Sequence, residues 1–234
     1  MAGTSIKAAI TELSPVTSLR GVGAALAEKL ATLNIRTIQD VLFHLPFRYE
    51  DRTQTIPIGS LQAGMRAVIE GEIQLSEVAF RGRRQLLVRI SDGSGWLTLR
   101  FFHFGAAQQT QLVRGTHLRC FGEVRSGPQT LEMVHPEYRR ITTDSSTIDS
   151  DTLTPIYPAS EGLQQARLRQ LSSAALEALR QHSIHDWLPA DLLPDPRWPT
   201  LQAALQYVHR PPPDARLELM AAGRHPAQRR LAFE

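Results

Sequence analysis

Cysteine, lysine and long apolar runs are scarce in this chain of 234 residues. The single cysteine, Cys120, excludes an internal disulfide and any zinc site built on several cysteines, and it fits a reducing cytoplasm. No apolar run approaches the roughly 18 residues of a membrane span, and the first residues lack the basic start and apolar run of a signal peptide. We therefore expect a cytoplasmic protein that does not cross a membrane.

The remaining composition is typical of a folded globular protein. Hydrophobic residues make up 42% of the chain and charged residues 21%, which excludes a disordered chain. The length allows one large domain or two small ones. We find no internal repeat.

Positive charge is concentrated in the middle of the chain. Residues 55–141 hold 11 arginines against 7 acidic residues, whereas the net charge of the whole chain is only +3. Only two cationic residues, Lys7 and Lys29, are lysines. A basic central segment suggests a polyanionic partner.

The first segment, residues 1–54, is predicted to form short helices. Leu26, Leu30 and Leu33 follow the glycines of "RGVGAALAEKL" at helical spacing. In "TIQDVLFHLP", Thr37 and Asp40 have the spacing of a capping box, and Pro46 stops the second helix.

From Met65 the apolar period changes to two, which indicates strands. We expect strands in "AVIEGEIQLSEV", "LLVRIS", "WLTLRFF", "HLRCFGEV" and "TLEMV", a hairpin turn in "DGSG", a basic loop in "AFRGRRQ" and a short helix in "GAAQQTQLV". Five strands with a helix between the third and fourth is the element order of an OB-fold. Residues 55–141 are therefore predicted to form a five-stranded OB-fold β-barrel.

The last part of the chain reads as helical. Residues 142–152, "TTDSSTIDSDT", have no apolar period and are predicted to be a loop or linker. Within residues 153–234, the spacing of Leu168, Leu171, Ala175 and Leu179 predicts an amphipathic helix, and "LQAALQYVHRPPP" a second one ended by prolines. The fold class is thus α+β: an OB-fold barrel flanked by N-terminal short helices and a C-terminal helical, proline-rich region.

The stretch "RFFHF" raises the question of where its three phenylalanine rings lie. Strand alternation places Phe101 on the apolar face and Phe102 on the opposite face with Arg100, and Phe104 would follow Phe102 if the strand continued. One interpretation is that Phe102 and Phe104 pack under a helix or a barrel cap. The other is a stacking platform, because OB-folds bind oligonucleotides through aromatic rings and arginines.

The predicted basic loop supplies three arginines, Arg81, Arg83 and Arg84, between the first two strands. This is the position of an OB-fold binding loop. The alternative is a solvated hairpin tip that charge keeps soluble. Together with the aromatic stretch, the loop makes nucleic-acid binding the leading hypothesis.

Three weaker patterns allow a structural or a functional reading. "LRGVGAAL" resembles the hairpin of a helix-hairpin-helix motif, but a single G-x-G favours the interpretation as a glycine turn that joins two packed helices. His182 and His185 are three residues apart without an acidic or cysteine cluster, which argues against a metal site. Glu50 and Asp51 stand between two arginines, which favours a local ion-pair turn over acid–base chemistry.

The collinear series "SLRGVGAALAEKL", "LFHLPFRYEDR", "ISDGSGWLTLRFFHF", "HPEYR", "LTPIYP" and "HPAQRRLAFE" resembles the N-terminal region of the RecG family of bacterial branched-DNA helicases. The resemblance implies an OB-fold wedge domain that splits strands at a junction, beside an ATP-driven motor that acts on stalled forks and Holliday junctions. The family's wedge aromatic falls on Phe102. Members often carry asparagine next and a second aromatic four residues after the first; this chain has His103 and Ala106, and Phe104 is a candidate substitute.

No G-x-x-x-x-G-K-[ST] phosphate loop is present. We therefore expect no ATP hydrolysis by this chain and no cofactor in it, and we interpret it as a wedge-domain fragment or truncated product of a RecG-type helicase. ATP and Mg²⁺ are expected with the motor of the full-length family member.

The sequence thus predicts a structure-specific binder of branched DNA, and the alternative is an OB-fold module that binds another replication or repair protein. We expect a monomer, with a single-stranded DNA-binding protein as one candidate partner. The candidate DNA-binding residues are Phe102, Phe104, Arg100, His103, Arg81, Arg83 and Arg84.

Overall fold

The computed structural model describes residues 10–141, 153–180, 184–186, 188–189, 192–195, 197–212 and 214–233, except for the side chain of Arg81. The predicted linker, residues 142–152, lies outside them. The chain forms two compact units: a helical unit, residues 1–51 with 152–234, and a β unit, residues 52–151. Within the described residues, no helix is both long and apolar enough to span a membrane.

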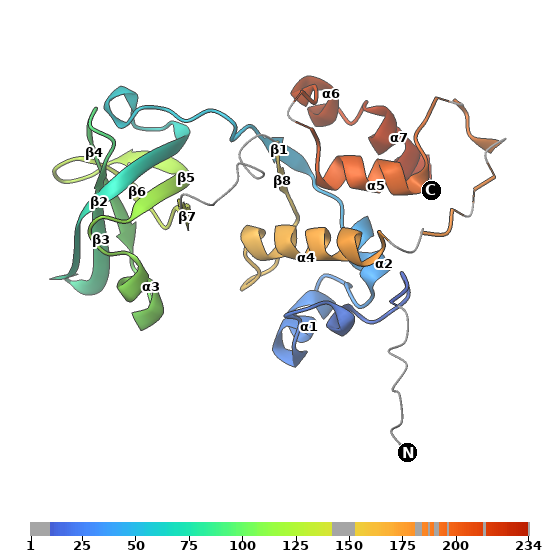
Figure 1. The fold of residues 1–234 in the computed structure, drawn as a ribbon, viewed down its shortest axis with the longest axis horizontal. Helices are drawn as coiled ribbons and strands as arrows, with labels where there is room; N and C mark the ends of the chain where they lie inside the picture. Colours follow the sequence, from blue (N-terminus) through green and yellow to red (C-terminus); the bar gives the residue numbers. More distant parts are fainter. Residues whose placement is uncertain are drawn as a thin grey trace, which may run out of the picture. The chain divides into compact units, whose positions relative to one another are not determined.

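The helical unit is assembled from both ends of the chain (Figure 1). A short 3₁₀ turn, Val16–Ser18, precedes its helices. Its helices and strands are α1 (Ala24–Ala31), α2 (Ile38–Phe43), β1 (Arg48–Glu50), β8 (Thr154–Ile156), α4 (Gln165–Ala178), α5 (Leu201–His209), α6 (Leu217–Ala221) and α7 (Pro226–Phe233). Strands β1 and β8 pair antiparallel, with Tyr49 opposite Pro155.

The predicted capping box begins α2. The Thr37 side chain accepts a hydrogen bond from the Asp40 backbone N–H, and the Asp40 carboxylate accepts one from the Thr37 backbone N–H at 2.8 Å. These hydrogen bonds, with one from the Arg36 backbone N–H, lower the pKa of Asp40, although desolvation acts in the opposite direction. A helix of only six residues depends on such a cap, because few of its backbone groups find partners within the helix.

One hydrophobic core joins the two chain segments of the helical unit. Helices α1 and α2 contribute Leu30, Ile38 and Leu42, and these residues share a core with Leu168 of α4 and Leu205 of α5. Residues 1–54 and 153–234 were predicted as separate regions. Instead, neither segment buries its apolar face without the other.

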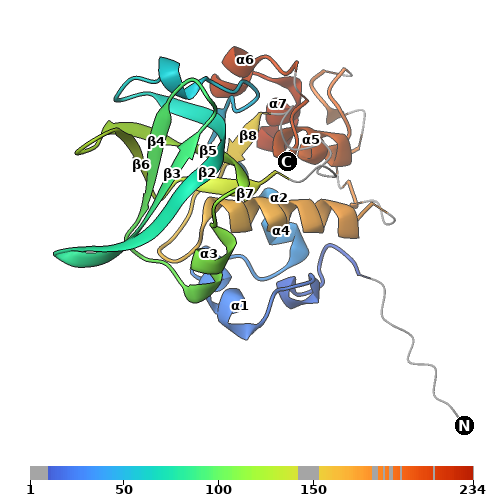
Figure 2. The same cartoon turned by 60° about the vertical axis from the view of Figure 1, so that its left-hand side comes forward.

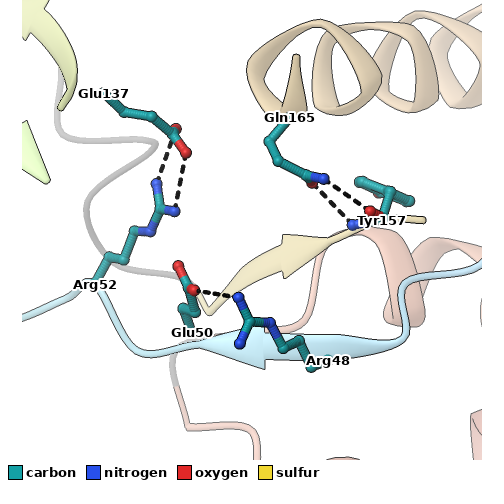
Figure 3. A network of polar contacts seen from close by, with 6 residues as sticks. All are labelled: Arg48, Glu50, Arg52, Glu137, Tyr157 and Gln165. Atoms are coloured by element: carbon teal, nitrogen blue, oxygen red, sulfur yellow. Dashed lines mark hydrogen bonds and ion pairs between the residues drawn. The ribbon is translucent and has the colours of Figure 1, made fainter. Parts of the chain in front are cut away.

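A buried polar network ties these helices together. The Tyr157 hydroxyl lies 2.8 Å from His209 Nδ1 and 2.9 Å from Ser172 Oγ, and His209 Nε2 lies 2.7 Å from the Leu42 carbonyl oxygen. Since Nε2 donates to that carbonyl, Nδ1 is left to accept from Tyr157. Burial lowers the pKa of His209 to about 4. Figure 3 shows the Gln165 amide holding the backbone of Tyr157 through two hydrogen bonds.

The β unit is a mixed sheet with one short helix. It contains β2 (Arg66–Arg81), β3 (Arg83–Ser91), β4 (Trp96–Phe101), α3 (Ala106–Gln111), β5 (His117–Ser126), β6 (Leu131–Val134) and β7 (Glu137–Arg140), after a 3₁₀ turn at Ile58–Ser60. The strand order is β2-β3-β4-β6-β5-β7, and β4 and β6 run parallel.

The length of β2 closes this sheet. Its first part, Arg66–Glu72, pairs with β5, and its second part, Glu72–Arg81, pairs with β3 across a register shift between Ile73 and Leu75. Five strands therefore form a ring in the order expected of an OB-fold, with α3 between the third and fourth. The sixth strand, β7, pairs with β5 outside the ring and was not predicted.

The β4 alternation agrees with the prediction. Leu97, Leu99 and Phe101 are buried in the barrel core, whereas Thr98 and Arg100 lie on the outer face. The predicted "DGSG" turn also forms. Its Asp92 carboxylate accepts hydrogen bonds from Ser94 and from the Ile58 backbone N–H, and this pins the turn against the Ile58–Ser60 segment.

Two predictions in this region were wrong. "AFRGRRQ" is not a loop: β2 and β3 continue through it, with Ala79 opposite Gln85, Phe80 opposite Arg84, and Gly82 at the turn with φ of 76°. The third strand was predicted to include Phe102, but it ends at Phe101. Strand propensity in short arginine-rich segments is weak, and cross-strand pairing decides.

Candidate nucleic-acid interface

The candidate interface lies where the β2–β3 hairpin projects beyond the barrel. Pairing of β3 with β4 begins at Leu86, and pairing of β2 with β5 ends at Glu72, so residues 78–85 pair only with each other. We name residues 78–85 the hairpin tip. Figure 2 shows it extending past the other strands of the sheet.

Charge on the hairpin tip is of one sign. Between Glu77 and Asp92 the sequence contains four arginines and no acidic residue. Arg83 and Arg84 are exposed, and among the described residues neither guanidinium is paired with a carboxylate. The tip is thus a site of unneutralised positive charge that can attract phosphate groups.

Phe102 lies directly after β4 on the outer side of the sheet. Its ring is half-buried, with the Arg83 guanidinium carbon 3.5 Å from the ring centroid. Its backbone N–H donates to His135 Nε2 at 3.1 Å. The ring is therefore held in one place by a cation–π contact, while part of it remains open to solvent.

His135 organises this corner and was missed by the sequence reasoning. The centroid of its ring lies 5.9 Å from that of Phe101, which it meets edge-on, and 5.8 Å from that of Phe102. It also stacks on the His103 ring, with the two centroids 5.9 Å apart. Burial, then the neighbouring His103 and Arg83, lower the pKa of His135. A neutral ring can accept the hydrogen bond from the Phe102 backbone N–H. The sequence signal that could have identified His135 was its place in the "HPEYR" motif.

Phe104 does not share the surface of Phe102. It is half-buried and packs against the barrel core, with the Arg84 guanidinium carbon 4.4 Å from its ring centroid. Phe104 was expected on the side of Phe102 only if the strand continued, and β4 ends at Phe101, before either residue. Of the two interpretations of the aromatic stretch, packing describes Phe104, whereas Phe102 is half-buried under Arg83 and its use as a stacking platform stays a prediction.

Arg100 is engaged inside the protein. It binds the Glu132 carboxylate through Nη2 at 2.5 Å and Nε at 3.0 Å, and Nη1 donates to Gln85 Oε1 at 2.6 Å. Its side chain is 12% exposed. Arg100 lies on the outer face as expected, but its charge is paired with Glu132 of the neighbouring strand, and a DNA contact through it stays a prediction.

The predicted site residues thus divide into groups. Arg83 with Phe102 and the exposed His103 form one cluster on the outer side, Arg84 with Phe104 forms another, and Arg100 stands apart. The side chain of Arg81 is outside the described part of the structure.

A shallow groove crosses the outer face of the sheet beside this corner. It is lined by the apolar side chains of Leu75, Leu87 and Pro128 and by polar groups that include Arg89 and Thr98. The groove lies on the middle strands, where OB-folds bind ligands. Among the described residues, no group of three or more His, Cys, Asp and Glu side chains could hold a metal ion.

The other motifs have structural partners. In the glycine turn that precedes α1, the Gly21 carbonyl oxygen accepts a hydrogen bond from Arg167 of α4, which supports the packing interpretation of "RGVG". The Arg52 guanidinium holds Glu137 through two hydrogen bonds of 3.0 and 3.2 Å, and Arg48 pairs with Glu50 at 3.1 Å (Figure 3). The Arg52 guanidinium also lies 3.6 Å from the centroid of the Phe121 ring.

Comparison with known proteins identifies relatives of this chain. The family model described as the RecG wedge domain matches residues 15–179, more than half of the chain. The ATP-dependent DNA helicase RecG of Escherichia coli K12 is 47% identical over 98% of the chain, and that of Acidithiobacillus ferridurans is 42% identical over 100%. The chain spans about a third of the length of these relatives, 33% and 32% respectively.

A solved structure shares the fold. The structure of RecG bound to a three-way DNA junction matches 95% of this chain and 29% of that chain, with a TM-score of 0.74 and 24% sequence identity.

Proposed function

Because the chain belongs to the RecG wedge-domain family, we propose that its β unit binds branched DNA at the point where the strands separate. The observation that carries the proposal is the corner at the end of β4. There the half-open Phe102 ring lies under Arg83, beside a hairpin tip that holds arginines and no carboxylate.

The chemistry of this corner suits a branch point. An unpaired base has a free π-face, and stacking on an aromatic ring contributes about 1–3 kcal/mol per base. A guanidinium can stack on a ring and still donate hydrogen bonds to phosphate in its own plane. Phe102 would cap the last base pair, while Arg83 and Arg84 hold the adjacent phosphates.

Remodelling of stalled forks and Holliday junctions is proposed for the longer protein. The relatives are named ATP-dependent DNA helicases, and the chain matches about a third of their length. We propose that ATP and Mg²⁺ bind outside the matched third, in a cytoplasmic protein that acts as a monomer. ATP hydrolysis by this chain alone in the presence of forked DNA would contradict the proposal that ATP binds outside the matched third.

A second candidate function is binding of a protein partner. The groove beside Leu75, Leu87 and Pro128 is partly apolar, and it could hold a peptide of another replication protein, such as a single-stranded DNA-binding protein. Salt separates the two candidates. Phosphate contacts predict a steep fall in affinity for forked DNA between low and moderate salt, whereas an apolar peptide contact does not.

The test of the proposed function compares forked, Holliday, duplex and single-stranded DNA of matched length. We expect this chain to prefer branched DNA, and Phe102→Ala to lose about tenfold in fork affinity with little change for plain duplex, within the range for one stacked base. Phe102→Tyr keeps a ring and should retain the preference. Trp96→Ala, which removes a 53% exposed ring at the start of the same strand, is the matched control.

Equal affinity of the unmodified chain for all four DNAs would remove the proposal. So would a loss caused by Trp96→Ala that matches the loss caused by Phe102→Ala. Fluorescence anisotropy at several salt concentrations gives both the affinities and the salt slope.

A further inference from the structure

We propose that Phe80, in the hairpin tip, is a second base-stacking residue that contacts DNA on the face opposite Phe102. The inference rests on the proposed function and deepens it, because it assigns a contact to each strand. Phe80 has no role in the proposal above.

Strand register puts Phe80 and Arg83 on opposite faces of the tip. Val78 and Leu86 are opposite each other, and both contact the barrel core. Phe80 and Arg84, two residues farther along each strand, are opposite each other and continue that inner face beyond the barrel. Arg83, the neighbour of Arg84, therefore belongs to the outer face.

The contacts at the base of the tip agree with this division. On the outer face, Arg83 lies over Phe102, and Gln85 accepts a hydrogen bond from Arg100. On the inner face, Arg84 lies over Phe104, whose ring packs on the barrel core. Each face thus carries an arginine, and each has an aromatic ring beside it.

Phe80 is exposed to an extent that packing does not explain. Its side chain is 76% exposed, the largest value for a large apolar residue among those described. A phenylalanine at the end of a projecting hairpin gains nothing from burial within this chain. An aromatic ring in that position can stack on a base or wedge between two bases.

Charge selects a nucleic-acid strand as the occupant of this face. Arg84 shares this face with Phe80, and no acidic residue lies between Glu77 and Asp92. From Leu86 to Gly82 the tip extends for four residues, or about 13 Å at the usual rise of a strand. That reach corresponds to about four nucleotides of a stacked strand. A strand on each face could therefore meet both an arginine and a ring.

The test uses the 234-residue chain and forked DNA that carries 2-aminopurine at the first unpaired position of one strand or the other. The fluorescence of this base reports its stacking. We expect Phe102→Ala to abolish the fluorescence change that binding causes in the probe of one strand. Phe80→Ala should abolish the fluorescence change in the probe of the other strand. Phe80→Ala should also lower fork affinity about tenfold, equivalent to about 1.4 kcal/mol, without changing the thermal midpoint.

Two substitutions at the same position separate stacking from apolar contact. Phe80→Tyr should keep the fluorescence change, and Phe80→Leu should lose it although it remains apolar. Phe80→Ala that leaves both probes and the affinity unchanged would overturn the inference. The inference would also fail if Phe80→Ala and Phe102→Ala abolished the fluorescence change in the same strand.

The outcomes distinguish this inference from the proposed function. If the unmodified chain shows no preference for forks, the proposed function fails. If the preference exists and depends on Phe102 but not on Phe80, only the role of Phe80 fails.

Discussion

Phe101 and Phe102 are adjacent residues of one type with opposite environments. Phe101 is 2% exposed and meets the rings of Tyr138 and His135 edge-on, whereas Phe102 is half-buried on the outer side under Arg83. A base can reach only the second ring. The proposed function therefore assigns DNA recognition to Phe102, whereas Phe101 contributes to stability.

Phe101→Ala should behave as a core deletion. It removes a fully buried ring from the barrel and should cost about 3–5 kcal/mol of the free energy of unfolding. Phe102→Ala should cost about 1 kcal/mol or less, because it loses chiefly a cation–π contact. Urea unfolding of both variants checks the difference. If Phe102→Ala proved the more destabilising, the assigned strand faces would be reversed.

His209 should make the stability of the helical unit depend on pH. Its pKa is about 4 in the folded chain, below the usual 6.5, because burial disfavours the charged ring. The unfolded state therefore binds a proton that the native state does not. This contribution is complete above about pH 6.5 and is lost as pH falls toward 4, by about 3 kcal/mol in total.

His209→Gln is the control for this prediction. Glutamine can still donate to the Leu42 carbonyl but does not titrate. We expect the variant to be less stable at neutral pH and to lose less stability between pH 6.5 and 4.5, as measured by chemical unfolding at each pH. Parallel profiles of unfolding free energy against pH for the two proteins would exclude His209 as the source of the pH dependence.

At the scale of an element, the hairpin tip combines two roles that are usually separate. Its backbone pairing continues the sheet, and its side chains carry charge outward. Gly82 makes the turn possible, since its φ of 76° lies in the left-handed region that glycine adopts at low cost. Strand pairing fixes the backbone that carries these arginines better than the predicted loop would.

Replacing Arg81, Arg83 and Arg84 with alanine should weaken binding to every DNA substrate together and lower the salt slope by up to about three units. The matched control is the triple replacement of Arg114, Arg139 and Arg140, which are exposed in the same unit and change the net charge equally. Anisotropy titrations at several salt concentrations measure both. Equal effects of the two triple variants would mean that only net charge matters.

At the scale of the whole molecule, the two ends of the chain fold together. The core of the helical unit contains residues from α1 and α2 as well as from α4, α5 and α7. The β unit has its own core of residues from the barrel strands. The chain is therefore organised as an insertion, in which residues 52–151 interrupt the helical unit.

Deletion of residues 1–51 should unfold the helical unit. It would expose the apolar faces of α4 and α5, including Leu168, Leu171 and Leu205, which pack with Leu30 and Leu42 in the same core. We expect loss of helical circular dichroism and aggregation. Residues 52–141 expressed alone should keep a cooperative unfolding transition. A soluble, cooperatively folding fragment of residues 152–234 would contradict the shared core.

Local patterns were sufficient for the five strands of the ring, for α2 and for the buried face of β4, although they missed β7 and the strand pairing in the hairpin tip. Period-two alternation predicted that Leu97, Leu99 and Phe101 face inward, and capping-box spacing predicted the start of α2, because these features depend on residues a few positions apart. The family could also be recognised from the motif series, which the family model confirms. The distribution of arginines and acidic residues along the sequence indicated that the middle of the chain is basic.

Long-range pairing decided the rest. Arg100 is neutralised by Glu132, and Phe102 is positioned by His135; each pair is more than 30 residues apart in sequence. Such contacts depend on which strands become neighbours when the barrel closes, and periodicity carries no information on that choice. The same holds for the shared core of the two chain ends, where a helix's apolar stripe predicts burial but does not identify the helix that covers it.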